Sequence, residues 1–168
     1  AGEMTFQVLA QVAGRAGRGK IPGRVVLQTF NPAHFSIESA RAQDFMAFYN
    51  QEIKFRKALG YPPFSRMIQF KMAGRDRGKT REHAESLGRL CNRLIHDESG
   101  RFRDIQRLGP IEAPVARIAG RYRWQAILKS SSVSELRSMI HRLVLDNGSF
   151  FSNREVHTAI DVDPFFMM

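Results

Sequence analysis

Two arginines near the start of the chain are candidates for a contact with a phosphate group. Residues 11–18 read Gln-Val-Ala-Gly-Arg-Ala-Gly-Arg, so Arg15 and Arg18 each directly follow a glycine. An arginine placed against a phosphoryl group neutralises the negative charge that builds up during phosphoryl transfer. The simpler alternative is a basic turn at a helix end, because glycine removes side-chain bulk and tolerates positive φ. The residues alone leave both interpretations open.

The same run resembles motif VI of superfamily 2 helicases, whose pattern is Gln-x-x-Gly-Arg-x-Gly-Arg. The resemblance implies that Arg15 and Arg18 are candidate arginine fingers, which in such systems raise rates roughly 10³- to 10⁵-fold. It also implies that Gln11 couples the nucleotide pocket to the rest of the lobe. Since this motif lies late in the second RecA-like lobe of the superfamily, we expect a chain beginning at Ala1 to be the C-terminal part of a longer helicase.

A second run, residues 73–80, reads Ala-Gly-Arg-Asp-Arg-Gly-Lys-Thr and fits a relaxed phosphate-binding loop. The fit is poor, because Arg75, Asp76 and Arg77 place bulk where small residues would let backbone N–H groups wrap a phosphate. Superfamily 2 helicases also carry this loop far upstream of motif VI. We therefore expect a turn and a helix start here, and an autonomous nucleotide-binding enzyme is the alternative.

The composition favours a nucleic-acid partner. The chain has 168 residues and a formal net charge of +10, which attracts polyanions more readily than membrane surfaces. No apolar run approaches the roughly 18 residues that a membrane-spanning helix needs, and no signal-peptide core is present, so a cytoplasmic setting is expected. We interpret the single Cys91 as a core residue. The five histidines show no ligand spacing, so no metal site is predicted.

Residues 121–129 combine cationic and apolar side chains in strict alternation. This spacing predicts a strand with Tyr122 and Trp124 on an apolar face and Arg121, Arg123 and Lys129 on the opposite face. The row of cationic side chains could follow a phosphate backbone, or it could be an ordinary solvated face. For Trp124, packing in the core is favoured. The candidate nucleic-acid contacts are Tyr61, Arg66, Arg117, Arg121, Arg123 and Lys129. The next candidates are Lys54, Arg56 and Lys57, which share an acid-free stretch with Arg66.

The elements before residue 64 are expected to belong to two domains. Apolar spacing predicts a helix over residues 4–13, a β-rich run predicts a strand from Arg24 to Phe30, and residues 35–59 are predicted to form one helix ended by Gly60. We expect residues 1–32 to be the C-terminal remnant of the second RecA-like lobe with motif VI. Residues 33–63 are expected to form a helical linker, and residues 64–168 a C-terminal domain that binds DNA and partner proteins.

The residues after this boundary alternate between strand and helix periodicities. Strands are predicted over 66–72, weakly over 104–108 before a Gly109-Pro110 turn, and over 121–129 and 156–162. Helices are predicted over 80–96 and from a Ser132–Glu135 capping box to Asn147. The fold class is therefore α+β, with the split β-α-β-β-α-β order of a ferredoxin-like arrangement that places both helices on one sheet face.

Four further segments sharpen the resemblance: Leu-Gln-Thr-Phe-Asn-Pro (27–32), Ala-Leu-Gly-Tyr-Pro-Pro-Phe-Ser-Arg (58–66), Gly-Arg-Tyr-Arg-Trp-Gln (120–125) and Ile-Asp-Val-Asp-Pro (160–164). With motif VI they resemble the C-terminal part of the bacterial primosomal protein N′ family of replication-restart helicases. The resemblance implies an S10-like C-terminal domain in an ATP-dependent 3′ to 5′ DNA helicase. The partners it implies are forked and single-stranded DNA, single-stranded-DNA-binding protein and other primosome proteins.

The same resemblance divides the cofactors between this chain and the full-length protein. ATP and Mg would serve the full-length helicase, and a zinc site would lie only upstream. This fragment alone is expected to bind no cofactor and to be inactive as an ATPase, because only part of a composite nucleotide pocket is present. The blander alternative is a basic module associated with RNA or the ribosome.

Overall fold

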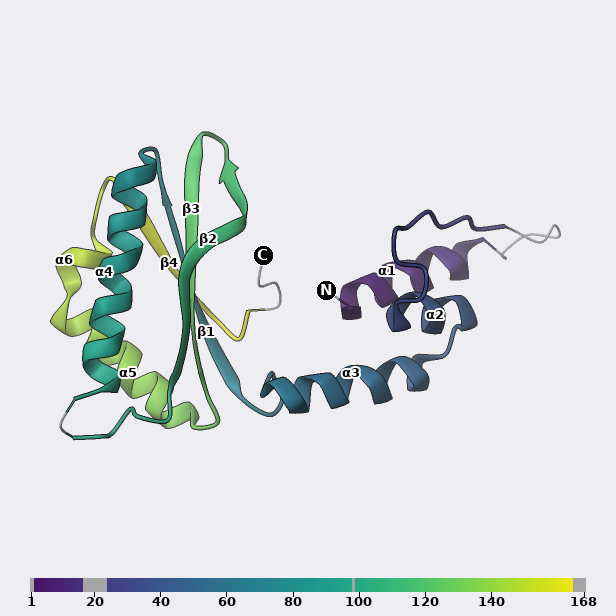
Figure 1. Cartoon of the computed structure of the whole chain (residues 1–168), viewed down its shortest axis with the longest axis horizontal. Helices are drawn as coiled ribbons and strands as arrows, with labels where there is room; N and C mark the ends of the chain where they lie inside the picture. The colour runs from purple at the N-terminus through teal and green to yellow at the C-terminus, as the bar shows by residue number, and fades with distance from the viewer. Residues whose placement is uncertain (1, 17–23, 98, 165–168) are drawn as a thin grey trace. The chain divides into compact units, whose positions relative to one another are not determined.

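The computed structural model describes residues 2–16, 24–97 and 99–164. The chain divides into two compact units, Ala1–Gly60 and Tyr61–Met168 (Figure 1). The three-part division expected from the sequence stays a prediction. Arg18 and the other residues of 17–23 lie outside the described residues.

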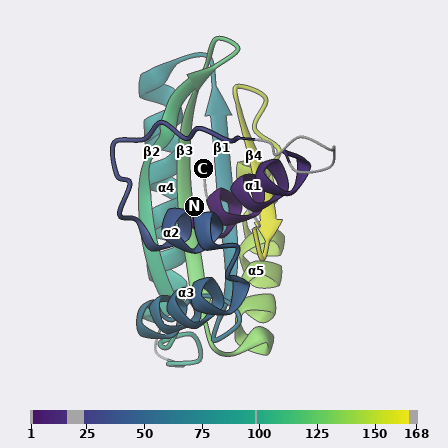
Figure 2. The same cartoon turned by 90° about the vertical axis from the view of Figure 1, so that its right-hand side faces the viewer.

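The described residues of the first unit form three helices (Figure 2), which pack around aromatic rings. They are α1 (Gly2–Arg15), α2 (Phe35–Ala42) and α3 (Phe45–Leu59). The rings of Phe6 and Phe48 stack with their centroids 4.5 Å apart, which joins α1 to α3. An ion pair between Arg56 and Glu3, 2.6 Å from Nη2 to Oε2, links the same two helices. The helix predicted over residues 4–13 is confirmed as part of α1.

The prediction of one helix over residues 35–59 is wrong, because the chain breaks between α2 and α3. Gln43 adopts a left-handed conformation with φ 54°, and Asp44 caps the helix that follows. The Asp44 carboxylate accepts a hydrogen bond from Ala47 N at 2.8 Å. Aspartate at this position satisfies a backbone donor that would have no partner in the first turn, so the sequence carried a start signal that the apolar spacing concealed. The expected stop at Gly60 is confirmed, with φ 57° at the C-cap of α3.

The strand predicted from Arg24 to Phe30 is also wrong. These residues have no regular secondary structure, and the side chains of Val26 and Phe30 are exposed. A β-rich composition forms a strand only where a neighbouring strand can pair with its backbone. The described residues of the first unit contain no strand that could do so.

The second unit is built on a four-stranded antiparallel sheet with the order β2-β3-β1-β4. Its elements are β1 (Arg66–Gly74), α4 (Arg77–Ile95), β2 (Gln106–Ile118), β3 (Arg121–Ser130), α5 (Val133–Asp146), α6 (Gly148–Phe151) and β4 (Val156–Val162). Both α4 and α5 lie on one face of the sheet, as Figure 1 shows. The predicted α+β class and split β-α-β-β-α-β order are therefore confirmed.

The core of this unit lies between the sheet and the two helices. Phe70 of β1 and Leu128 of β3 are fully buried there, as are Leu87 of α4 and Met139 of α5. Cys91 belongs to the same cluster, which confirms its interpretation as a core residue, and burial raises the pKa of its thiol to about 12. The thiol therefore stays protonated and unreactive at neutral pH.

Strand β2 corrects the prediction of a turn at Gly109-Pro110. The strand continues through these two residues, and the register with β3 shifts between Leu108 and Ile111. Gly109 has φ 81°, and a Cβ there would lie 2.9 Å from the Gln125 carbonyl oxygen. Glycine is therefore required at an irregularity inside the strand, and the weak strand predicted over 104–108 is the start of a longer one.

The predicted helix after Ser132 is confirmed as α5, with half of the expected capping box. Ser132 Oγ accepts a hydrogen bond from Glu135 N at 3.3 Å. The reciprocal bond does not form, because Ser132 N donates instead to Ser130 Oγ at 3.0 Å. One capping bond is enough to set the start of the helix.

A buried histidine makes the stability of this unit depend on pH. His83 of α4 stacks on Phe150, with ring centroids 3.8 Å apart, and shares a 2.8 Å hydrogen bond with Thr158 of β4. Burial lowers the pKa of His83 below its ordinary value, because the charged imidazolium loses its hydration. The neutral ring therefore stabilises the fold above about pH 6.5, the unfolded pKa. This contribution is lost as the pH falls through the lower folded pKa.

We predict that the free energy of unfolding falls between pH 7.5 and pH 5, and that His83→Gln makes this fall smaller. His141→Gln, which changes an exposed histidine of α5, is the matched control and should leave the pH dependence as in the parent chain. Chemical denaturation followed across this pH range measures the difference. Equal pH dependence in parent and His83→Gln would show that the His83 pKa is not lowered by folding.

Candidate nucleic-acid interface

Strand β3 presents its cationic side chains on the sheet face opposite α4 and α5. Trp124 and Leu128 are buried in the core beneath these helices, so the alternation along the strand places Arg121, Arg123 and Lys129 on the other face. The predicted parity and the core interpretation of Trp124 are therefore confirmed. The described residues of this unit place no helix on the cationic face.

The three cations of β3 have different surroundings. Arg121 is exposed at the start of the strand, whereas Arg123 is half-buried and donates from Nη1 to the Val115 carbonyl oxygen at 3.3 Å. Lys129 Nζ lies 5.5 Å from the centroid of the Tyr61 ring, within the range of a cation–π contact. The structure therefore brings together Tyr61 and Lys129, two candidates from separate segments of the sequence.

Arg66 is engaged by a carboxylate. Its Nη1 lies 3.0 Å from Asp163 Oδ2, and Asp163 Oδ1 accepts a hydrogen bond from Met67 N at 3.1 Å. This exposed ion pair contributes little stability, but it offsets the charge that Arg66 would present to a phosphate. Arg66 is therefore a weaker candidate than its place in an acid-free stretch of sequence indicated.

Arg117 lies apart from the three cations of β3. It pairs with Tyr122 in the β2–β3 ladder, so the two side chains share the sheet face opposite Arg121 and Arg123. The Arg117 guanidinium lies 4.9 Å from the centroid of the Tyr122 ring. This placement follows from the β2–β3 register. Because β2 is irregular, the register cannot be predicted from the alternation of residues in the sequence.

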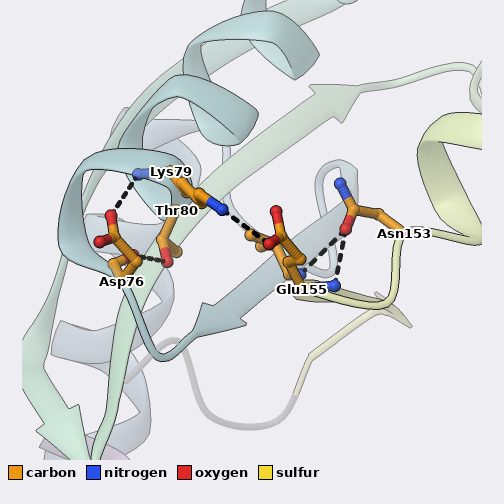
Figure 3. A network of polar contacts seen from close by, with 6 residues as sticks. Asp76, Lys79, Thr80, Asn153 and Glu155 are labelled. Carbon is orange, nitrogen blue, oxygen red and sulfur yellow. Dashed lines mark hydrogen bonds and ion pairs between the residues drawn. The ribbon is translucent and has the colours of Figure 1, made fainter.

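Residues 73–80 form a turn and the start of α4, as expected. The Asp76 carboxylate accepts a hydrogen bond from Lys79 N at 2.8 Å, and Thr80 Oγ1 donates to the Asp76 carbonyl oxygen at 2.5 Å (Figure 3). Lys79 Nζ forms a 2.6 Å ion pair with Glu155 Oε1, which raises the pKa of Lys79. These contacts occupy the lysine, the hydroxyl and the first helical turn, the groups through which a phosphate loop would hold a nucleotide.

The end of β1 carries a cluster of arginines that the sequence analysis did not single out as a site. Here β1 ends at Gly74, which pairs with Tyr122 on one side and with Val156 on the other. A hollow of about 420 Å³ lies at this end and is lined by Arg75, Asp76, Lys79, Arg121, Arg154, Glu155 and Val156; we call it the β1-end hollow. Only the order of strands in the sheet brings these distant residues together.

The motif VI candidates belong to the first unit. Gln11 and Arg15 are exposed on α1, and Arg15 is the last residue of that helix. Arg18 lies outside the described residues. Gly14 has no atom within 4 Å of the position that a Cβ would take, so nothing among its described neighbours requires glycine there. The alternative of a basic helix end and that of an arginine finger are therefore both compatible with this geometry.

The described residues also bear on two other kinds of site. No group of three or more His, Cys, Asp or Glu side chains is arranged there to hold a metal ion. None of the described helices is long and apolar enough to cross a membrane.

The fold and its cationic end define a small α+β domain of the split β-α-β-β-α-β class with a basic surface. Residues 57–165 match the family model described as the primosomal protein N C-terminal domain, and the chain belongs to this family. It is 31% identical over 166 residues to the replication restart protein PriA of Bacillus subtilis (strain 168), and 33% identical over 162 residues to that of Synechocystis sp. (strain ATCC 27184 / PCC 6803 / Kazusa).

The similarity extends through nearly all of this chain but through a small part of each relative. The replication restart protein PriA of Treponema pallidum (strain Nichols) is 38% identical over 164 residues, which cover 98% of this chain and 24% of the relative. The corresponding shares are 99% and 20% for the Bacillus subtilis protein and 96% and 18% for the Synechocystis protein. The chain therefore spans about a fifth of the length of these curated relatives.

Residues 73–80 are not expected to bind a nucleotide tightly. We expect titration with ATP and Mg to give no affinity tighter than millimolar, and Lys79→Ala to cause no change, because Lys79 pairs with Glu155. Isothermal titration calorimetry measures the affinity, and a phosphate-release assay should find no hydrolysis by this chain. Tighter binding that disappears in Lys79→Ala would instead support the autonomous nucleotide-binding enzyme.

Proposed function

We propose that the Tyr61–Met168 unit is a DNA-binding domain of a replication-restart helicase. The observation that carries this proposal is the concentration of cationic side chains on the helix-free sheet face and at its β1 end, in a chain of the primosomal protein N C-terminal family. Basic side chains bind the phosphate backbone through counterion release, a term that is independent of sequence. Forked DNA is the proposed substrate because the relatives are replication restart proteins.

The charges on the helix-free face support a phosphate contact. Arg121, Arg123 and Lys129 lie on this face of β3. The register places Lys71 of the neighbouring β1 beside Gln125, and Asp161 of β4 forms a 2.6 Å ion pair with Lys71. The acidic side chain is thus engaged by a cation on the same face, and the surface keeps an excess of positive charge.

The first unit is proposed to be the end of the second RecA-like motor lobe and the linker that follows it. Supporting this proposal are the match of residues 11–18 to motif VI and the exposed apolar side chains Met4, Val8 and Val12 on α1. Exposed apolar groups at this spacing form a helix stripe of the kind that packs on a larger domain. Gln11, Arg15 and Arg18 would then act on ATP and Mg held in part by segments outside this chain. The zinc site of such a helicase would also lie upstream.

The proposed protein partners rest on family membership alone. A replication-restart helicase works with single-stranded-DNA-binding protein and other primosome proteins, and we propose such partners for the longer protein.

The DNA proposal predicts a specific salt dependence. Arg121→Ala combined with Arg123→Ala should weaken binding to every DNA sequence tested and lower the salt slope by roughly 0.7 to 0.9 per lost contact, because fewer counterions are released. Arg93→Ala combined with Arg137→Ala, which removes two exposed arginines from α4 and α5, is the matched control. Fluorescence anisotropy from 50 to 200 mM salt measures both, and thermal melting checks the fold.

Two outcomes would oppose this proposal. If both double variants keep the parent salt slope, Arg121 and Arg123 are ordinary solvated charges. If RNA of matched length and shape binds more tightly than branched, duplex or single-stranded DNA, the RNA- or ribosome-associated module becomes the better account.

The motor-lobe proposal is tested in the longer protein. Arg15→Ala or Arg18→Ala should leave fork binding largely intact while sharply lowering ATP hydrolysis and unwinding, since a contact made in the transition state adds little to ground-state binding. Arg41→Ala, on α2 of the same unit, is a charge-matched control. ATPase rates equal to the parent's in the Arg15 and Arg18 variants would refute the assignment.

A further inference from the structure

We propose that the β1-end hollow binds one backbone phosphate of the nucleic acid and is the strongest single phosphate contact of the Tyr61–Met168 unit. This inference rests on the proposed DNA-binding function and gives it a location. The proposed ligand is a phosphodiester group clamped by Arg75, Arg121 and Arg154. Of these arginines, only Arg121 belongs to the row on β3.

The fold itself brings the three arginines together. Gly74, the last residue of β1, pairs with Tyr122 in β3 and with Val156 in β4. Arg75 directly follows Gly74, and Arg121 directly precedes Tyr122. Arg154 lies two residues before Val156. Because both neighbours run antiparallel to β1, the end of the central strand must meet the beginnings of β3 and β4.

The arginines of the hollow lack partners that would neutralise them. Arg75, Arg121 and Arg154 have no carboxylate partner among the described residues, and all three are exposed. The hollow is lined by four basic and two acidic residues. Of the two acidic residues, Glu155 forms an ion pair with Lys79 Nζ at 2.6 Å. The Asp76 carboxylate accepts a hydrogen bond from Lys79 N at 2.8 Å. Three neighbouring guanidinium groups repel one another, and a bound anion would relieve this repulsion.

The walls of the hollow are held in place by other contacts. Asn153 Oδ1 accepts hydrogen bonds from Glu155 N at 2.8 Å and from Val156 N at 3.2 Å, which fixes the loop that carries Arg154 (Figure 3). A Cβ on Gly74 would lie 3.1 Å from the Glu155 carbonyl oxygen, so glycine lets this loop approach β1 closely. A rigid setting lowers the entropy lost when arginine side chains clamp a ligand.

The chemistry of the hollow favours a phosphodiester over a nucleotide. Guanidinium groups form paired hydrogen bonds with phosphate oxygens and keep their charge at any physiological pH. The first turn of α4 contributes little to anion binding, because the Asp76 carboxylate already accepts a hydrogen bond from a backbone N–H group of that turn. The three arginines of the hollow are exposed, so a continuous strand can pass across them. Among the described residues that line the hollow, Val156 alone is apolar, so the site offers little surface for a base or a ribose to pack against.

The test compares two arginines of the hollow with a matched arginine at the other end of α4. Arg75→Ala and Arg154→Ala are each introduced into the 168-residue chain, and Arg93→Ala is the control, because Arg93 is exposed in the last turn of the same helix. Affinity for a fluorescent single-stranded oligonucleotide and for a fork of mixed sequence is measured from 50 to 200 mM salt. Melting temperatures check that each variant folds.

Arg75→Ala and Arg154→Ala should each weaken binding roughly threefold or more and lower the salt slope by up to about 0.7 to 0.9, the value for complete loss of one phosphate contact. Arg93→Ala should match the parent chain in both measurements. Arg154→Lys should restore part of the affinity and most of the salt slope, because it returns the charge without the paired hydrogen bonds.

The outcomes separate the hollow from the wider proposal. If the parent chain binds DNA and the hollow variants behave as Arg93→Ala does, the phosphate site in the hollow is refuted. The proposed DNA-binding function of the unit is then unaffected. If the parent binds no DNA, both proposals fail. A titration with inorganic phosphate distinguishes a free anion site: phosphate binding that is lost in Arg154→Ala, with DNA affinity unchanged, would also overturn the inference.

Discussion

The central position of β1 governs the rest of the Tyr61–Met168 unit. This strand pairs with β3 along its whole length and with β4 from Ile68 to Gly74, and its Phe70 side chain is buried beneath both helices. The pairing fixes which residues face the core and which lie on the helix-free face. It also fixes which chain segments meet where β1 ends, and this places Arg75 beside the starts of β3 and β4.

Much of this unit could be predicted because its helices and strands have clear local sequence patterns. Alternation in β3 predicted both the burial of Trp124 and the cationic face, and apolar spacing predicted α4 and α5. The failures have local causes as well. The Asp44 cap was hidden within a long apolar pattern, and the residues from Arg24 to Phe30 have strand-forming side chains but no strand beside them.

The roles of individual arginines were harder to predict because their partners are distant in sequence. Arg66 forms an ion pair with Asp163, and Arg117 contacts Tyr122 across an irregular ladder, so neither presents a free charge beside Arg121. Arg154, in contrast, comes from an acidic part of the sequence that gave no reason to choose it. The split β-α-β-β-α-β order places the loop before β4 beside the end of β1, and this is the signal in the sequence that points to Arg154.

The central proposal is that nucleic acid contacts the β1 end and the adjacent face of β3. Hydrogen–deuterium exchange of the chain with and without a single-stranded oligonucleotide tests this most directly, because it locates the contact without any substitution. Bound nucleic acid should slow exchange in residues 74–80, 121–123 and 153–156. Slower exchange confined to the outer surfaces of α4 and α5, or to the first unit, would contradict this proposal.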